Sequence, residues 1–101
     1  MFEEIYNMLK EEKAVAVIRT NTYEEAKEIS IAAIEGGMKI IEVTMSVPGA
    51  PKLIKELKEE YKDACVGAGT VLTKDAVDKC IENNADFIVI ILLCSFLVLW
   101  F

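Results

Sequence analysis

The chain has 101 residues, of which 53% are hydrophobic and 28% are charged, and its formal net charge is −6. This length suits one small domain, and the composition excludes a disordered segment. The acidic balance argues against a nucleic-acid partner, and the absence of histidine excludes Ser-His and Cys-His nucleophile pairs together with the commonest metal ligand.

The three cysteines, Cys65, Cys80 and Cys94, follow no metal-binding or disulfide pattern. Their number is odd and no two are spaced as Cys-x-x-Cys, so neither a disulfide framework nor a zinc site is indicated. We expect each to be a small buried apolar residue. The N-terminal residues lack the basic and apolar regions of a signal peptide, so we expect a cytoplasmic protein with reduced thiols.

Hydrophobic periodicity predicts helices that alternate with short strands along the chain. We expect helices over 2–12, from a Thr22 cap to about 35, from about 48 to 61 and from a Thr73 cap to about 83, and strands that start near 14, 39, 64 and 86. Strands at this period indicate a parallel sheet with right-handed crossovers. Doubly wound sheets and (β/α)8 barrels both satisfy the pattern. An eight-unit barrel needs about 200 residues or more, so the chain holds at most half of one.

The strand near residue 40 carries a charged residue inside an apolar, β-branched run that ends before Pro48. Alternation puts Ile40, Glu42 and Thr44 on one face. A carboxylate in a buried strand is costly unless it is paired or solvated. Glu42 is therefore either a side chain near the strand end that reaches water or an active-site acid at the mouth of an α/β barrel.

Polar residues also end the neighbouring strands. On the face taken as inward, Arg19 follows Val15 and Val17, Glu42 and Thr44 follow Ile40, and Thr70 follows Val66 and Ala68. A cation, a carboxylate and two hydroxyls are thus predicted to gather at the C-terminal ends of three adjacent strands, where barrel enzymes keep their active sites. The alternative is that Arg19 is a surface residue at a turn and Thr70 an ordinary strand-end residue.

Two glycines on the third strand, Gly67 and Gly69, are expected to let a ligand approach the backbone closely. They do not form a dinucleotide-binding fingerprint, because Leu72 stands where the third glycine belongs and no helix start follows directly. We therefore reject a dinucleotide site at this turn.

Four motifs resemble a known family in order and spacing. They are AVAVIR at 14–19, EGG at 35–37, IEVT at 41–44 and VGAGTV at 66–71. Together they resemble the N-terminal half of 2-keto-3-deoxy-6-phosphogluconate (KDPG) aldolase, also called 4-hydroxy-2-oxoglutarate (KHG) aldolase, over about residues 1–89. The resemblance implies a homotrimeric class I aldolase with a (β/α)8 barrel and no metal or other cofactor. It further implies a small keto acid (pyruvate, KDPG or KHG) as the binding partner, with KDPG split into pyruvate and glyceraldehyde 3-phosphate.

The resemblance also implies roles for individual residues. Glu42 matches the general acid/base that moves protons during Schiff-base formation and carbon–carbon cleavage. Thr70 matches a position that lines the pyruvate end of the site, and Thr44, in the same motif as Glu42, is expected to bind substrate. Many members carry an arginine that holds the pyruvate carboxylate where this chain has Ser46, so Arg19, with two parallel donors, is the expected substitute.

The last twelve residues, 90–101, read as a hydrophobic tail unlike the family, and no charged residue follows Asp86. The family places its Schiff-base lysine on a sixth strand, and no lysine here matches it. We therefore expect a truncated barrel that has no aldolase activity by itself. Three origins of the tail stay open: a frameshift or premature end, a misassembled reading frame, and a genuine segment that binds a membrane or a partner.

The resemblance to half a barrel has a physical consequence. A sheet of this kind leaves parallel edges and an interior face open to water, so we expect the chain to self-associate. The alternative to an enzyme is a non-catalytic half-barrel assembly or membrane-tethered module.

Overall fold

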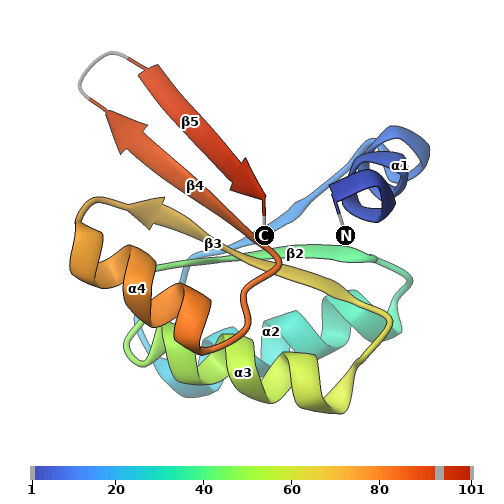
Figure 1. The fold of residues 1–101 in the computed structure, drawn as a ribbon. Helices are drawn as coiled ribbons and strands as arrows, with labels where there is room; N and C mark the ends of the chain where they lie inside the picture. The colour runs from blue at the N-terminus through green and yellow to red at the C-terminus, as the bar shows by residue number, and fades with distance from the viewer. Residues whose placement is uncertain (1, 93–94, 101) are drawn as a thin grey trace.

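The structure is a computed structural model that describes the backbone of residues 2–92 and 95–100 and the side chains of residues 3–90. Helices and strands alternate along most of the chain (Figure 1). The helices are α1 (Phe2–Glu12), α2 (Tyr23–Glu35), α3 (Ala50–Glu60) and α4 (Lys74–Glu82), and the strands are β1 (Ala16–Ile18), β2 (Ile40–Thr44), β3 (Cys65–Val71), β4 (Phe87–Leu92) and β5 (Ser95–Trp100). The predicted helices and the first four strands are confirmed.

The strands form one sheet in the order β1-β2-β3-β4-β5. The first four are parallel, as the βα period predicts, and β5 runs antiparallel to β4. Helices α2, α3 and α4 cover one face of the sheet, and α1 lies on the other side (Figure 1). A sheet covered by helices on one face and open on the other is what part of a (β/α)8 barrel presents.

Local sequence signals set the helix starts. The Thr22 hydroxyl accepts a hydrogen bond from the Glu25 amide at 3.2 Å, and the Thr73 hydroxyl accepts one from the Ala76 amide at 3.1 Å. Each cap satisfies one of the amides that a helix leaves without a partner at its N-terminus. Both predicted caps are therefore confirmed.

The main core lies between the sheet and helices α2–α4. Its fully buried side chains include Ile41 and Val43 from β2 and Leu53 and Leu57 from α3. Burying each of these side chains stabilises the fold by about 1.5–3 kcal/mol. On the other side, Ile5 of α1 packs with Ile40, Cys65 and Phe87 in a smaller cluster. We call this second side of the sheet, which α1 covers only in part, the open face.

The register of β3 corrects one prediction. Parallel pairing places Ile41 beside Val66 and Glu42 beside Gly67. Val66 therefore packs in the helix-side core, as does Ala68, and the expectation that these two residues face inward with Glu42 is wrong. The run from 64 to 72 is small or apolar at almost every position, so alternation gives no signal that distinguishes its two faces.

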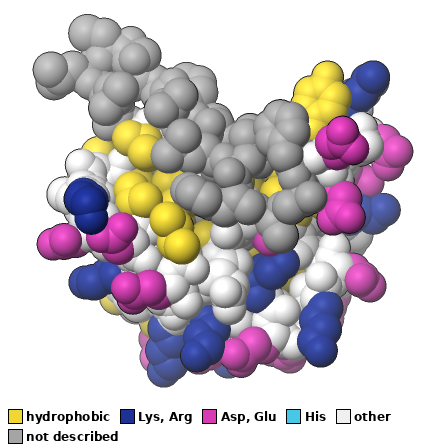
Figure 2. Space-filling view, viewed as in Figure 1, with side chains coloured by type: hydrophobic (Ala, Val, Ile, Leu, Met, Phe, Trp, Pro, Cys, Tyr) yellow, Lys and Arg dark blue, Asp and Glu magenta, His cyan; other side chains and the backbone are white. Residues whose placement is uncertain are grey.

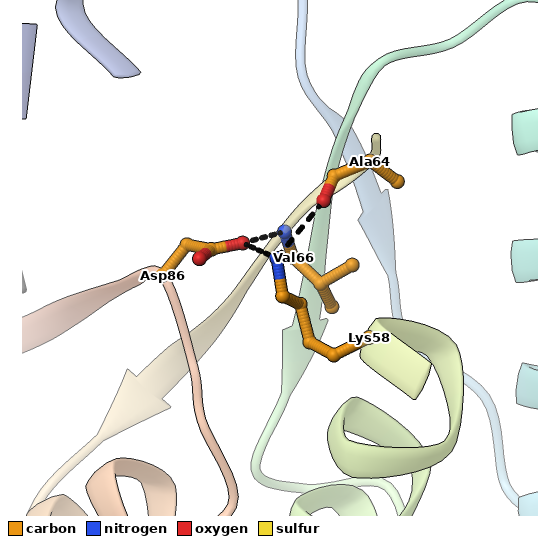
Figure 3. A network of polar contacts seen from close by, with 4 residues as sticks. All are labelled: Lys58, Ala64, Val66 and Asp86. Atoms are coloured by element: carbon orange, nitrogen blue, oxygen red, sulfur yellow. Dashed lines mark hydrogen bonds and ion pairs between the residues drawn. The ribbon is translucent and has the colours of Figure 1, made fainter. Parts of the chain in front are cut away.

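A network of polar contacts fixes the start of β4 (Figure 3). Lys58 Nζ of α3 donates to Asp86 Oδ2 at 2.6 Å and to the Ala64 carbonyl at 3.2 Å, while the Val66 amide donates to the same carboxylate at 2.9 Å. Asp86 is 9% exposed, and a charge that is this buried persists only when it is paired. The network ties α3, β3 and β4 together at the N-terminal end of the strands.

Lys and Arg side chains intermingle with Asp and Glu over the helical side of the molecule, whereas hydrophobic side chains gather in a patch left of centre in the same view (Figure 2). One apolar groove of about 290 Å³ lies where β3 leads into α4, and its lining includes Leu72, Val77 and Ile90.

Within the part of the chain that the structure describes, no helix combines the length and apolar character needed to cross a membrane.

Candidate active site

The polar residues expected at the mouth of the sheet do come together. Arg19 follows β1, Glu42 and Thr44 lie on β2, and Thr70 lies on β3. The Arg19 guanidinium donates through Nη2 to the Thr70 hydroxyl at 3.0 Å and through Nη1 to the Ser46 hydroxyl at 3.3 Å. One arginine thus bridges the C-terminal ends of β2 and β3. We call Arg19, Glu42, Thr44, Ser46 and Thr70 the mouth cluster.

Thr44 lies beneath this bridge and is fully buried. Its hydroxyl donates to the Ile18 carbonyl at 3.2 Å and lies 2.8 Å from the Ser46 hydroxyl. The contacts of Thr44 therefore hold β1 to β2 and steady Ser46, which in turn contacts Arg19.

Ser46 is the functional candidate that sequence reasoning missed. From the sequence, position 46 stands out only because many family members have an arginine there. Strand alternation carries on from Glu42 and Thr44 to Ser46, and this signal could have identified it. Together with Thr70, Ser46 fixes the orientation of the Arg19 fork, whose parallel N–H groups suit a carboxylate.

Thr70 reaches Arg19 because of an unusual backbone. Its φ angle is +55°, in the left-handed region that β-branched residues rarely adopt, and the pairing of β3 with β4 shifts register between Ala68 and Val71. Regular alternation would place residue 70 on the same face as Val66 and Ala68, against the helices. The irregular backbone instead lets its hydroxyl meet the guanidinium, and strain of this kind is concentrated at functional sites.

Glu42 is half-buried on the open face. Burial raises the pKa of its carboxyl group above the ordinary value of 4.5, and the nearby Arg19 charge opposes that rise. Within the described part of the chain, Glu42 makes no hydrogen bond or ion pair that would hold it in the charged form. The side chain reaches the open face, as the solvated interpretation requires, but its raised pKa is the property that an acid/base group needs.

The expectation that Gly67 and Gly69 admit a ligand to the backbone is wrong. The ring of Phe87 occupies the space above Gly67, and the end of the Glu42 side chain occupies the space above Gly69. The glycines make room for the protein's own side chains on the open face.

The described residues offer no group of three His, Cys, Asp or Glu side chains arranged to hold a metal ion. Cys65 and Cys80 are buried and free, which confirms the prediction for these two; Cys94 lies outside the described residues. Burial raises the pKa of the Cys65 thiol to about 12 and that of Cys80 to about 11. Thiols with such values are poor nucleophiles.

Comparison with known families gives one match that covers most of the chain. The family model described as KDPG and KHG aldolase matches residues 5–97. A 2-dehydro-3-deoxy-phosphogluconate aldolase of Treponema pallidum is 31% identical over 84% of this chain and 40% of its own length. The enzyme of the same name from Zymomonas mobilis is 42% identical over 64% of this chain and 31% of its own length.

Solved structures give the same result. The KDPG aldolase of Legionella pneumophila, solved with pyruvate captured as a covalent carbinolamine intermediate, superposes with a TM-score of 0.64 at 31% identity, over 73% of this chain and 36% of its own. The Zymomonas mobilis enzyme, solved with 3-phosphoglycerate, gives a TM-score of 0.62 at 35% identity, over 73% of this chain and 35% of its own. The α/β fold is thus that of the N-terminal part of a (β/α)8 barrel, and the chain spans about a third of the length of these relatives.

Proposed function

Since the chain belongs to the KDPG and KHG aldolase family, we propose that it carries the carboxylate-binding and proton-transfer part of a Schiff-base aldolase site. The reaction is the cleavage of KDPG or KHG into pyruvate and an aldehyde. The observation that carries the proposal is the Arg19 fork, held between Ser46 and Thr70 beside a half-buried Glu42.

Arg19 is proposed to bind the substrate carboxylate. A guanidinium presents two parallel N–H groups that match the two oxygens of a carboxylate, and hydrogen bonds between charged groups are about twice as strong as neutral ones. The hydroxyls of Ser46 and Thr70 limit its rotation, so less conformational freedom is lost when the anion binds. Thr44 contributes through Ser46, whose hydroxyl it holds at 2.8 Å.

Glu42 is proposed to move the protons of the reaction. After a lysine amine adds to the ketone, the carbinolamine loses its hydroxyl as water, with Glu42 as the proton donor, and a protonated imine remains. When the carbon–carbon bond breaks, its electron pair moves into the imine to form an enamine, and the hydroxyl proton of the departing aldehyde passes to Glu42. The same proton then returns to the enamine carbon, and hydrolysis releases pyruvate and the free amine. The raised pKa supports this role, because it makes the carboxyl group a better proton acceptor than an ordinary glutamate.

The amine must come from outside the mouth cluster. None of the lysines in the described part of the chain hydrogen-bonds to the cluster, and the chain spans only 36% of the Legionella pneumophila enzyme that forms the carbinolamine with pyruvate. We propose that the nucleophile lies in the part of the family's barrel that this chain does not span. The chain by itself then forms no pyruvate imine.

Complementation tests this proposal. The chain is mixed with a separately produced C-terminal portion of a family member, and pyruvate release and borohydride trapping of pyruvate are followed. We expect no adduct on the chain by itself, and both pyruvate release and an adduct on the added portion after mixing. Glu42→Gln should lower release at least 100-fold, and Arg19→Lys should lower kcat/KM about tenfold because a single point charge replaces the fork. An adduct on the unmixed chain, or full activity of Glu42→Gln in the mixture, contradicts the proposal.

A second candidate is a non-catalytic assembly of half-barrels. Val17 is 57% exposed on the open face, and β1 pairs on one side only among the described strands. An apolar face beside an unpaired strand edge favours association with another copy. Residues 90–101 are proposed to be separate from the βα pattern of 1–89, and the antiparallel direction of β5 supports this division. Sedimentation of the chain before and after mixing distinguishes the candidates, because a complementing half should replace self-association with a one-to-one complex.

A further inference from the structure

We infer that Gly69 is a positioning residue for Glu42: the missing side chain at position 69 creates the space in which the Glu42 carboxyl group lies. The inference rests on the proposed function in one respect, which is that Glu42 transfers a proton. It adds a residue without a side chain that determines where the acid/base group lies.

The geometry of β3 supports a steric role for Gly69. A Cβ atom built at this position would lie 2.6 Å from Glu42 Cδ and 2.9 Å from Cγ, with Oε2 nearer still. Real Cβ atoms essentially never approach other heavy atoms within 3.0 Å. The left-handed φ angles of the described glycines belong to Gly37 and Gly49, so the backbone at 69 would accept alanine without strain. Room for the carboxyl group, and not backbone freedom, is what requires glycine there.

The neighbouring glycine explains why the carboxyl group lies over Gly69. In the parallel register Glu42 pairs with Gly67. Gly69 pairs with Thr44, two residues nearer the C-terminal end of the strands. The space over Gly67 is filled by Phe87, whose ring atoms would lie 2.5–2.6 Å from a Cβ there. The Glu42 side chain therefore leans along the strand toward the other residues of the mouth cluster. Phe87 thus fills the space over Gly67, and the absence of a side chain at Gly69 leaves space for the Glu42 carboxyl group.

A side chain at position 69 should move the carboxyl group and leave the fold intact. The atoms in the way are the far end of a flexible side chain on a face that is open to solvent, so they can rotate away. The charged group that faces Glu42 is Arg19, which directly follows β1. On its other side, β3 offers two glycines and the Thr70 hydroxyl, and β4 offers Phe87. Displacement toward solvent removes the burial that raises the pKa of Glu42.

A carbon-13 NMR titration of the glutamate carboxyl groups tests the inference in the full chain. The Glu42 resonance is assigned by its loss in Glu42→Gln. We expect its pKa to fall toward 4.5 in Gly69→Ala. In Gly36→Ala, the same substitution at the end of α2 where φ is −77°, we expect the wild-type value. An unchanged Glu42 pKa in Gly69→Ala, or an equal fall in Gly36→Ala, overturns the inference.

A second variant covers the case in which Gly69→Ala does not fold. If the methyl group is harmful only because it meets Glu42, the double variant Glu42→Ala/Gly69→Ala should fold as well as Glu42→Ala does. A double variant that also fails to fold overturns the inference. The titration does not depend on aldolase activity, so a negative complementation result, which counts against the proposed function, leaves this test readable.

Discussion

The two ends of the parallel sheet carry half-buried or buried carboxylates in opposite electrostatic settings. At the N-terminal end, Asp86 accepts hydrogen bonds from Lys58 Nζ at 2.6 Å and from the Val66 amide at 2.9 Å. At the C-terminal end, Glu42 has no such partner among the described residues, and burial raises its pKa against the opposing charge of Arg19. Burial is costly for both charges, and only Asp86 has contacts that compensate for it.

This difference indicates a structural role for the Asp86 carboxylate and a proton-transfer role for the Glu42 carboxyl group. A carboxylate that accepts from an ammonium group and an amide ties the elements that carry these donors together. A carboxyl group that lacks these contacts is poised to change its protonation state, and perturbed carboxyl groups gather at functional sites. The Asp86 contacts let the N-terminal end supply stability, while the C-terminal end keeps the group that the proposed chemistry needs.

The largest expected change in stability comes from removing the paired Asp86 carboxylate. Asp86→Ala leaves the Val66 amide without its acceptor and the Lys58 ammonium with the Ala64 carbonyl but no carboxylate partner. We expect it to lower the free energy of unfolding by about 3 kcal/mol. Urea denaturation measures this. Asp86→Asn keeps an acceptor for the Val66 amide, so its free energy of unfolding should lie between those of wild type and Asp86→Ala. Lys74→Ala, which breaks an exposed pair with Asp78 on α4, should change stability by less than about 0.5 kcal/mol. An Asp86→Ala variant as stable as Lys74→Ala would contradict the structural role.

A smaller effect should distinguish the two glycines of the open face. Gly67→Ala drives a methyl group against the ring of Phe87, which is 4% exposed and cannot swing into solvent. We expect a loss of about 1–3 kcal/mol from this overpacking. In Gly69→Ala, the nearest atoms to the new methyl group belong to the flexible Glu42 side chain. The lower entropy of the unfolded chain offsets part of any cost, so the stability of this variant should stay within about 1 kcal/mol of wild type. Denaturation of both variants side by side checks the ranking, and a reversed order would show that Glu42 is held more rigidly than Phe87.

Much of the fold could be predicted because its signals are local. The Thr22 and Thr73 caps and the regular return of apolar runs mark the helices and the four parallel strands without reference to distant residues. The facing of β3 could not be predicted, because small or apolar residues fill both of its faces. The antiparallel direction of β5 also depends on pairing with β4, and a hydrophobic run by itself does not specify a direction.

The candidate site could be predicted in its location but not in its contacts. Because the C-terminal ends of parallel strands lie at the same edge of the sheet, the sequence predicts that Arg19, Glu42 and Thr70 lie close together. The contacts of Arg19 with Ser46 and Thr70 join residues 27 and 51 positions apart, and the Thr70 contact depends on a left-handed backbone that no local pattern announces. Which side chain fills the space above each glycine is likewise a matter of three-dimensional packing.

The smallest effect should appear in the pH dependence of stability, and it tests the opposite electrostatics of the two ends directly. Because burial raises the pKa of Glu42 in the folded chain above 4.5, the folded state holds this proton more tightly than the unfolded state. Stability contributed by this group is fully present below pH 4.5 and is lost as the pH rises through the folded pKa. Glu42→Gln lacks the charge at every pH, so its Tm should match wild type near pH 4 and be slightly higher than wild type at pH 7. Glu28→Gln, exposed on α2, should show no such divergence. A Tm for Glu42→Gln below wild type at pH 7 would mean that the charged form of Glu42 is favoured in the fold, and the contrast with Asp86 would then fail.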